Sequence, residues 1–442
     1  MPTEQITVRL GVPGLDDELK GVSRGYIILL AGYPGSGKTT FASQFMYEGL
    51  KSGERGLYVS FVEPKEDFYV NSAKFGMSFQ EYESRGQFKY YEALNVSSPQ
   101  ALSDIIQDVL TQIDAEGFSR LAVDSVTAIS QLAGSAPRVR EIVHSALYAG
   151  LKRRGVTTVL VAELPLGGTE PTALGPEEFI ADGVIVLRYR FVRGKMERYA
   201  EIRKMRGFSV RISNAPIAIS SKGVVFPAPL NVLSLPSGVR PRRTINVLGL
   251  RLPEGSGVLM AHDPSLDPLW LSISGIVVPA LKSGLRVMYS SFVHGLYSLQ
   301  HAAEACLGSP LPEGLRLESY DASSLTAGEA ELLAYIQDLE FKPDVVVIED
   351  VNMLSEFIER PDYMGLVYRT LVRRASAGVT TIHLYSVTRA EVWNVPLSRY
   401  YDYVLYVSPV AQGVKVKMLR EWGSTSSQWA VTLSSKDLVC TK

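Results

Sequence analysis

Residues 32–40 read G-Y-P-G-S-G-K-T-T, the pattern G-x-x-x-x-G-K-T followed by a second threonine. Glycines allow backbone N–H groups to converge on phosphate oxygens without a Cβ atom in the way. The lysine adds a positive charge for the β- and γ-phosphates, and the hydroxyl of the next threonine is placed to bind Mg²⁺. The segment predicts a phosphate-binding loop (P-loop) for a nucleoside triphosphate, formed by Gly32, Tyr33, Pro34, Gly35, Ser36, Gly37, Lys38, Thr39 and Thr40.

The residues on either side of the loop support this prediction. Residues 26–31 form a short apolar run that predicts a buried strand, and residues 41–50 carry the apolar spacing of a helix. A helix that begins at the loop would direct the positive end of its dipole at the bound anion. The alternative is a glycine-rich turn in an ordinary strand–helix unit, and the flanking pattern argues against it.

Two carboxylates follow other predicted strands. Asp124 ends the apolar run 120–124, where a carboxylate suits Mg²⁺ coordination, directly or in the second shell. Glu63 follows the run 56–62 and could orient and deprotonate an attacking water molecule. Either residue could instead cap the helix that follows, although glutamate is a weak cap. We favour the metal role for Asp124 and the role of catalytic base for Glu63.

Lys204 and Arg206 lie near the end of a predicted strand that spans residues 198–205. Because they are two residues apart, both project from one face of the strand. Such a cationic pair could neutralise phosphate charge across a subunit boundary, as an arginine finger does. It could equally be the charge that protects a solvated edge strand, and the residue pattern alone does not decide between the two.

The chain repeats itself. Residues 51–63 align without gaps on residues 282–294, with eight of thirteen positions identical. Two shorter matches follow in the same order, 121–125 on 347–351 and 155–159 on 378–382. Buried strands reuse the same few residue types, but coincidence does not explain three matches in one order. We interpret the chain as a duplicated domain.

Each copy alternates apolar strands with helical segments, which predicts an α/β fold with a mostly parallel sheet covered on both faces. Strands are expected near 26–31, 56–62, 88–92, 120–125 and 157–162, and helices near 38–52, 64–75, 98–115 and 137–154. A hairpin is expected over 184–193 and 198–205. The predicted domains are 1–235 and 254–442, with 236–253 as a linker rich in Pro, Gly and Arg.

The second copy has lost the residues of the loop. Aligning Pro34 with Pro264 places Pro268 at the position of Lys38 and Leu269 at the position of Thr39. His294 stands where Glu63 stands in the first copy. The added Cβ atoms and the aspartates of this segment disfavour a triphosphate. We therefore expect a second domain that does not bind ATP and that serves for packing or for docking a protein partner.

Taken together, these motifs make the chain similar to KaiC-type ATPases of the RecA superfamily. The resemblance is carried over residues 5–230 by Gly11–Asp16, Gly32–Thr39, Phe61–Glu63, Asp124–Ser125 and Lys204–Gly207, and it continues more weakly over 245–435. It implies two tandem RecA-like P-loop domains, ATP and Mg²⁺ as ligands, and a homo-oligomer that is a hexameric ring with ATP between neighbours. By position, Lys38 and Thr39 would hold phosphate and Mg²⁺, Asp124 would support the metal, Glu63 would be catalytic, and Lys204 and Arg206 would reach the neighbour's ATP.

The chain departs from that family at two places in the first copy. Val62 stands where the family has the first of two paired glutamates, which makes slow turnover the expectation. Phe208–Val210 stands where the family often has a histidine, so that phosphate contact is not expected. In the second copy, the loss of the lysine equivalent removes the expectation of autokinase activity. The resemblance therefore implies a slow ATPase with a regulatory or signalling role.

Composition leaves two other functions open. With 45 basic and 46 acidic residues, the chain has no bulk attraction for nucleic acid, so a RadA-like accessory ATPase of DNA repair or recombination is an alternative that we do not favour. A nucleotide-dependent scaffold with little turnover is the other. No apolar run reaches membrane length and no signal peptide is apparent. The two cysteines, Cys306 and Cys440, indicate no disulfide framework, and we expect a cytoplasmic protein without a membrane partner.

Overall fold

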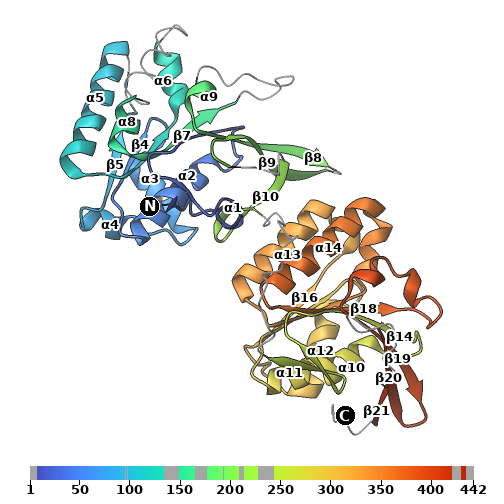
Figure 1. The fold of residues 1–442 in the computed structure, drawn as a ribbon. Helices are drawn as coiled ribbons and strands as arrows, with labels where there is room; N and C mark the ends of the chain where they lie inside the picture. Colours follow the sequence, from blue (N-terminus) through green and yellow to red (C-terminus); the bar gives the residue numbers. More distant parts are fainter. Residues whose placement is uncertain are drawn as a thin grey trace, which may run out of the picture. The chain divides into compact units, whose positions relative to one another are not determined.

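The computed structural model describes residues 7–94, 96, 98–133, 149–164, 177–192, 194–208, 214–226, 243–420 and 430–434. The chain divides into two compact units, residues 1–229 and residues 230–442 (Figure 1). Each unit has its own sheet and its own apolar cores.

The sheet of the first unit positions the predicted site. Its described strands are β3 (Ile27–Gly32), β4 (Gly56–Ser60), β5 (Phe88–Glu92), β6 (Arg120–Asp124), β7 (Thr157–Glu163), β8 (Gly183–Val192), β9 (Lys195–Met205), β10 (Asn214–Ser220) and β11 (Gly223–Val225). They are ordered β11-β10-β9-β8-β3-β7-β6-β4-β5. From β8 to β5 the neighbours are parallel, whereas β8 to β11 are antiparallel. Every residue of β3, β4 and β6 is buried, as expected for a parallel sheet covered on both faces.

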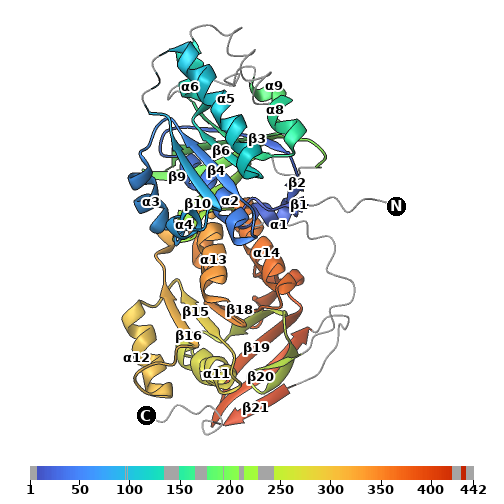
Figure 2. The same cartoon turned by 90° about the vertical axis from the view of Figure 1, so that its left-hand side faces the viewer.

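Helices cover both faces of this sheet. They are α1 (Leu15–Leu19), α2 (Lys38–Lys51), α3 (Lys65–Ala73), α4 (Gln80–Ser84), α5 (Pro99–Glu116), α6 (Val126–Ala133), α8 (Ala149–Arg154) and α9 (Glu177–Ile180), and two short strands, β1 (Thr7–Val8) and β2 (Val22–Ser23), pair with each other. Side chains of α2 and α3 share one core with alternate residues of β3, whereas α5, α6 and α8 pack on the other face. Figure 2 shows α5 and α8 on the side of the sheet opposite to α3 and α4.

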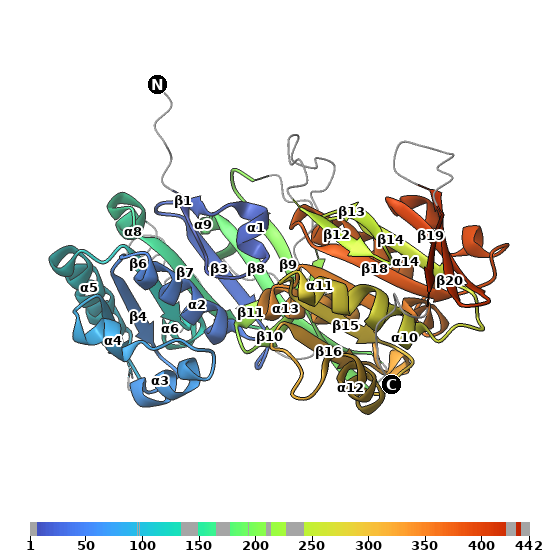
Figure 3. The same cartoon turned by 90° about the horizontal axis from the view of Figure 1, so that it is seen from below.

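The second unit repeats this plan (Figure 3). Its described strands are β12 (Thr244–Val247), β13 (Leu250–Pro253), β14 (Gly257–His262), β15 (Val287–Ser291), β16 (Leu315–Ser319), β17 (Val345–Glu349), β18 (Thr380–Ser386), β19 (Tyr403–Val410), β20 (Gly413–Arg420) and β21 (Ala430–Ser434). Its main sheet is ordered β16-β15-β17-β18-β14-β19-β20-β21. Replacing each strand by its counterpart turns this order into β5-β4-β6-β7-β3-β8-β9-β10. The predicted α/β class, two tandem domains with mostly parallel sheets, is confirmed.

The helices of the second unit also lie in two layers. They are α10 (Pro268–Ser272), α11 (Val278–Lys282), α12 (Leu296–Leu307), α13 (Ala327–Phe341) and α14 (Arg360–Ser376), with the π-helical η2 (Ile273–Val277) and the 3₁₀ turns η3 (Ala322–Ser324), η4 (Val351–Glu356), η5 (Val392–Asn394) and η6 (Ser398–Tyr400). Residues of α10, η2, α11 and α12 share one core, and residues of α13 and α14 share the other. In Figure 1, α13 and α14 lie on one side of this sheet and α10 to α12 on the other.

Two expectations differ from the structure. The strands β12 and β13, in the segment 236–253 that the sequence predicted as a linker, bury Ile245, Val247 and Leu252 in a core of the second unit, because alternate residues of this hairpin are apolar. Cys306 is disulfide-bonded, which was not expected from the sequence, so the cysteines no longer argue for a reducing compartment. Of the helix expected over 137–154, residues 137–148 lie outside the described residues.

Within the described part of the chain, the longest apolar helical stretches fall short of what a membrane-crossing helix requires.

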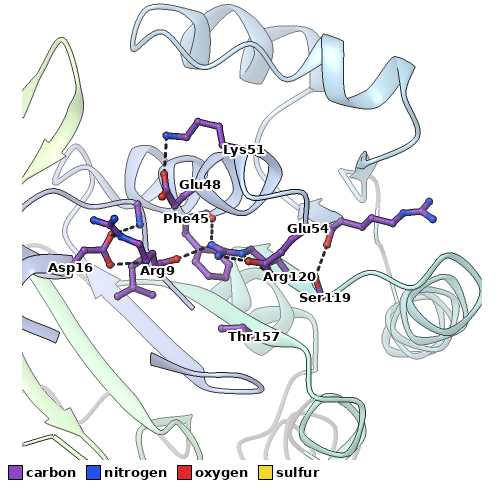
Figure 4. Close-up of polar contacts among 12 residues, drawn as sticks. Arg9, Asp16, Phe45, Glu48, Lys51, Glu54, Ser119, Arg120 and Thr157 are labelled. Atoms are coloured by element: carbon purple, nitrogen blue, oxygen red, sulfur yellow. Dashed lines mark hydrogen bonds and ion pairs between the residues drawn. The ribbon is translucent and has the colours of Figure 1, made fainter. Parts of the chain in front are cut away.

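A buried arginine on β6 holds together the segment before α1 and the helix α2 of the first unit (Figure 4). The guanidinium of Arg120 is almost fully buried and donates to both carboxylate oxygens of Glu54, at 3.1 and 2.7 Å. It also donates to the backbone carbonyls of Arg9, at 2.9 Å, and Phe45, at 2.6 Å. A Cβ atom at Gly49 would lie 2.2 Å from Arg120 Nε, so only glycine leaves room for it. Arg120 therefore links the segment before α1, helix α2 and strand β6.

We expect Arg120→Ala to lower the free energy of unfolding of the first unit by about 3–5 kcal/mol, because it removes the buried guanidinium that binds the Glu54 carboxylate and two backbone carbonyls. The four tryptophans all lie after residue 254. Denaturation followed by far-UV circular dichroism reports both units, whereas tryptophan fluorescence reports the second unit only, so the fluorescence transition is expected to move less.

The matched control is Lys51→Ala, which removes a surface ion pair between Lys51 and Glu48 within α2. It is expected to change the unfolding free energy by no more than about 1 kcal/mol. Equal effects of the two substitutions would show that the Arg120 network contributes nothing beyond a surface pair.

Candidate nucleotide site

The P-loop connects the buried strand β3 to helix α2. Gly35 and Gly37 have φ of 73° and 104°, in the left-handed region that side chains rarely adopt. A Cβ atom at Gly32 would lie 2.4 Å from the carbonyl oxygen of Leu187 on β8. Helix α2 begins at Lys38, so its first N–H groups, which have no intrahelical partner, face the loop. The glycines predicted from the sequence therefore occupy positions that only glycine fits.

Lys38 and Thr39 are held by short contacts at the start of α2. Lys38 is buried, and its Nζ donates to the carbonyl oxygen of Tyr33 at 2.9 Å. Burial lowers the pKa of Lys38, and the carboxylates of Glu163 and Asp124 oppose that shift. Thr39 Oγ1 donates to Asp124 Oδ2 at 2.8 Å. The structure thus brings together the lysine, the threonine and the aspartate that the sequence predicted at one site.

Asp124 ends β6 and is itself buried. Burial raises its pKa, whereas the hydrogen bonds from Thr39 and from the hydroxyl of Tyr58 lower it. Tyr58, on β4, is fully buried and donates to Asp124 Oδ2 at 3.1 Å. Tyr58 was not predicted from the sequence. Its place in the buried strand that leads to Glu63 could have suggested it, because a buried tyrosine hydroxyl requires a polar partner.

The backbone of Glu63 is fixed at the corner between β4 and α3. Ser60 Oγ accepts the N–H of Glu63 at 2.9 Å and donates to its carbonyl at 2.9 Å. The hydroxyl of Tyr90, whose ring stacks on Tyr58, donates to the same carbonyl at 2.7 Å. The side chain is half-buried, and Asn71 Nδ2 donates to its Oε1 at 2.6 Å. Glu63 is therefore connected through the two tyrosines to Asp124.

The pKa of Glu63 is raised. Burial is the largest cause, and the charges of Asp124 and Asp67 add to it. The hydrogen bond from Asn71 and the charge of Lys74 act in the opposite direction. A carboxyl group with a raised pKa is a better proton acceptor when ionised, which suits a general base.

A third carboxylate at this edge of the sheet was not predicted. Glu163 ends β7, directly beside Gly32 in the parallel pairing of β3 and β7. Its charge acts on both Lys38 and Asp124. The carboxyl ends of neighbouring parallel strands meet at one edge, so the strand order, once known, points to this residue.

Lys204 and Arg206 lie toward the amino ends of the parallel strands, whereas the P-loop of the same chain lies at their carboxyl ends. Gly32 is level with Leu187 on β8, whereas Lys204 is level with Val184, and the N–H of Arg206 bonds to the carbonyl of Asp182. Along the strands these offsets are about 10 and 16 Å. The side chain of Lys204 donates to the carbonyl of Glu178, and that of Arg206 lies 3.5 Å from Asp182. The structure does not bring these two residues to the chain's own P-loop.

The corresponding loop of the second unit is filled by protein groups. The registers of β3 on β7 and of β14 on β18 place His262 at the position of Gly32. The carboxylate of Asp267 accepts the N–H groups of Leu269 and Trp270, at 2.9 and 3.1 Å. In the first unit the equivalent N–H groups belong to Thr39 and Thr40. A carboxylate of the chain therefore occupies the helix terminus that a phosphate would need.

The counterparts of Glu63 and Asp124 bind each other in the second unit. Ser60 pairs with Asp124, and Ser291 pairs with Glu349, so Glu349 is the counterpart of Asp124. The alignment of 121–125 on 347–351 places Asp350 there and is wrong by one residue. It relies on similar residue types and not on the pairing of the strands. His294 Nδ1 lies 3.0 Å from both carboxylate oxygens of the buried Glu349. Among the described residues, no group of three or more His, Cys, Asp or Glu could hold a metal.

The first site fits ATP with Mg²⁺. It combines the three P-loop glycines, which we call the glycine cradle, with the buried Lys38 and with the Thr39 hydroxyl in contact with the Asp124 carboxylate. The Ser36 hydroxyl is buried without a hydrogen-bond partner among the described residues. Mg²⁺ is commonly held by one or two protein ligands together with phosphate oxygens, which Thr39 and Asp124 could supply. Of the segment Phe208–Val210, where no phosphate contact is expected from the sequence, residues 209 and 210 lie outside the described residues.

Comparison with known proteins agrees with this geometry. Residues 8–230 match the family model described as "ATPase: KaiC". The chain is 32% identical over 233 residues to a UPF0273 protein of Aeropyrum pernix, covering 49% of this chain and 92% of that protein. It is 32% identical over 233 residues to the circadian clock protein KaiC3 of Synechocystis, covering 51% of this chain and 46% of that protein. It is 26% identical over 394 residues to the circadian clock oscillator protein KaiC of Thermostichus vulcanus, covering 83% of this chain and 74% of that protein.

Proposed function

Because the chain belongs to the KaiC ATPase family, we propose that it hydrolyses ATP slowly at the site of its first unit, within a ring of identical subunits. The observation that carries this proposal is the contact of Thr39 with Asp124 beside the P-loop glycines, with Glu63 anchored just after β4, the strand that pairs with Asp124's strand β6. The second unit, in which Asp267 fills the loop, takes no part in the chemistry.

In this mechanism the residues of the first unit bind, orient and deprotonate. The N–H groups of the P-loop and the charge of Lys38 bind the phosphates. Bound Mg²⁺ would neutralise phosphate charge, and Thr39 and Asp124 would hold it. The ionised carboxylate of Glu63 accepts a proton from a water molecule, whose oxygen bonds to the γ-phosphorus while the bond to the ADP oxygen breaks. The exposed Val62 provides no second carboxylate, which supports slow turnover.

Lys204 and Arg206 support catalysis between subunits. Since both lie toward the edge of the sheet opposite to the chain's own P-loop, they can stabilise transferring phosphate only at the site of a neighbouring copy. A head-to-tail interface of this kind closes into a ring, and the resemblance to KaiC-type ATPases suggests six subunits. A cation supplied in trans stabilises the charge of the transition state.

A subunit-mixing experiment tests this function. Lys38→Ala subunits lack the phosphate charge but keep the cations, whereas Lys204→Ala/Arg206→Ala subunits lack the cations but keep the P-loop. Each variant alone is expected to release phosphate from ATP near background. A 1:1 mixture is expected to recover up to about a quarter of the wild-type rate, the share of head-to-tail interfaces that pair an intact loop with intact cations.

Light scattering with and without ATP·Mg²⁺ shows whether each preparation forms a ring. Wild-type activity of the Lys204→Ala/Arg206→Ala variant alone would contradict the role in trans, and so would a mixture no more active than its parents. ATP-dependent assembly with negligible phosphate release by the wild type would instead select the nucleotide-dependent scaffold.

The second unit is proposed to regulate or to bind a protein partner. Its fold is retained while its cradle is blocked by His262 and Asp267 and its two catalytic positions bind each other through His294 and Glu349. For the same reason we do not expect it to phosphorylate itself. The balanced charge of the chain disfavours the alternative of a DNA-repair accessory.

A further inference from the structure

Two exposed residues, Asn71 on α3 and Lys74 at its C-cap, form a chain of hydrogen bonds to the carboxylate of Glu63. Asn71 Nδ2 donates to Glu63 Oε1 at 2.6 Å. Lys74 Nζ donates to Asn71 Oδ1 at 2.9 Å. Asn71 and Lys74 are three residues apart, so they are neighbours on one face of the helix.

The contact with Lys74 determines which way the Asn71 amide faces. An amide oxygen accepts hydrogen bonds, whereas the amide nitrogen donates two. Because the ammonium group of Lys74 can only donate, it binds the amide oxygen and leaves the nitrogen toward Glu63. Lys74 therefore acts on Glu63 in two ways, by its charge and by fixing the donor that holds the carboxylate.

The backbone of Glu63 cannot reorient its side chain, because Ser60 and Tyr90 fix the N–H and carbonyl of this residue. Only the side-chain torsions remain, and the bond to Asn71 selects among them. That bond engages Oε1, and no described residue donates to Oε2. One carboxylate oxygen is thus fixed by the protein while the other stays available to a water molecule.

We propose that Asn71, held by Lys74, is a positioning residue that orients the carboxylate of Glu63 for activation of the attacking water. This inference rests on the proposed function, in which Glu63 is the general base. A base that is itself oriented by a third group is a recurring arrangement in catalytic sites.

The second unit provides an independent observation. Helix α12 begins as far after the end of β15 as α3 begins after the end of β4, so the offset of the alignment of 51–63 on 282–294 can be carried into the helix. At that spacing, His294 takes the place of Glu63, Ala302 that of Asn71, and Ala305 that of Lys74. We call Asn71 and Lys74 together the relay to Glu63. Both side chains of this relay are therefore missing in the copy that lacks the carboxylate.

The groups that face Glu63 predict the effect of removing the relay on the pH dependence. Asp124 from β6 and Asp67 from α3 disfavour the ionised carboxylate, as does burial, whereas Asn71 and Lys74 favour it. The hydroxyls of Tyr58 and Tyr90, on β4 and β5, remain neutral, since burial raises the pKa of both. Loss of Asn71 should therefore raise the pKa of Glu63 and move the acid limb of the pH–rate profile to higher pH.

The test measures phosphate release by the full-length chain for Asn71→Ala, Asn71→Asp and Lys74→Met. Asn71→Ala is expected to lower kcat roughly 3- to 10-fold, the effect of one lost hydrogen bond, with KM for ATP unchanged. Asn71→Asp places a second carboxylate beside Glu63 and is expected to move the acid limb further. Lys74→Met should act in the same direction as Asn71→Ala, but less.

Gln100→Ala is the matched control, because it removes an exposed bond between an amide and the carboxylate of Asp104 on α5. It should leave kcat and the acid limb at their wild-type values. In a Glu63→Gln background, adding Asn71→Ala should have no further effect, since the relay acts through the carboxylate.

These outcomes separate the two proposals. If Glu63→Gln releases phosphate at the wild-type rate, the assignment of the base fails. If Glu63→Gln is slow but the Asn71 and Lys74 variants behave like Gln100→Ala, the positioning role alone is overturned. An equal effect of Asn71→Ala with and without Glu63 would likewise overturn it.

Discussion

Lys38→Ala should greatly weaken the binding of ATP·Mg²⁺ to the chain. The Lys38 ammonium group is buried and held beside the loop by the Tyr33 carbonyl, so its charge is already desolvated when phosphate arrives. Removing one partner of a buried charge pair costs about 2–5 kcal/mol, which corresponds to a loss of affinity of roughly 30-fold or more. Isothermal titration calorimetry of the full-length chain with a non-hydrolysable ATP analogue measures this directly.

The same titration counts the sites. The wild type is expected to bind one analogue per chain, because Asp267 binds the helix N–H groups of the equivalent loop in the second unit and His262 replaces Gly32 there. Lys51→Ala is the matched control, since Lys51 lies on the same helix as Lys38 and pairs with Glu48 at the surface. Unchanged binding by Lys38→Ala, or saturation of the wild type at two per chain, would refute the assignment of a single site.

Glu63→Gln should slow phosphate release by roughly 100-fold or more, since general-base catalysis commonly contributes that much. Glutamine keeps the size of the side chain and can still bind Asn71, but it cannot accept a proton at neutral pH. ATP binding should change little, because Glu63 lies at the corner of β4 and α3, outside the P-loop. Single-turnover hydrolysis and analogue binding, measured on the same preparation, separate the two effects.

The pH profile provides a second readout for Glu63. Burial raises the pKa of this carboxyl group, so wild-type activity should fall on the acid side as the base becomes protonated, at a pH above the usual range of glutamate. Glu63→Gln should lack that limb. Glu66→Gln, an exposed neighbour on α3, should keep both the rate and the limb, and a wild-type profile for Glu63→Gln would exclude a role as base.

The parts of the site that could be predicted from the sequence are those where the local backbone allows only one type of residue. A left-handed φ at Gly35 and Gly37 and a close contact at Gly32 each require glycine, so the loop is readable without the fold. The carboxylates Asp124 and Glu63 could be predicted because Asp124 ends the buried strand β6 and Glu63 lies shortly after the buried strand β4. The fold class followed from the same alternation of apolar runs and helices.

The residues that were missed depend on long-range pairing. Glu163 reaches the site only because β7 lies beside β3, and Tyr58 because β4 pairs with β6. Asn71 is only eight residues from Glu63 in the chain, but their contact depends on how the two side chains are oriented at the corner between β4 and α3. The one-residue error at Glu349 has the same origin, since register between strands is determined by backbone pairing and not by similarity of side chains.

The carboxylate of Asp267 has a consequence for any attempt to revive the second loop. It is covalently attached to the helix whose N–H groups it binds, so it competes with a free triphosphate as an intramolecular inhibitor, with the advantage of effective concentration. Reintroducing lysine at position 268 would therefore add attraction without vacating the anion-binding groups. Nucleotide binding there can return only after the Asp267 carboxylate has been removed. More than one substitution is therefore needed to make the second loop resemble the first.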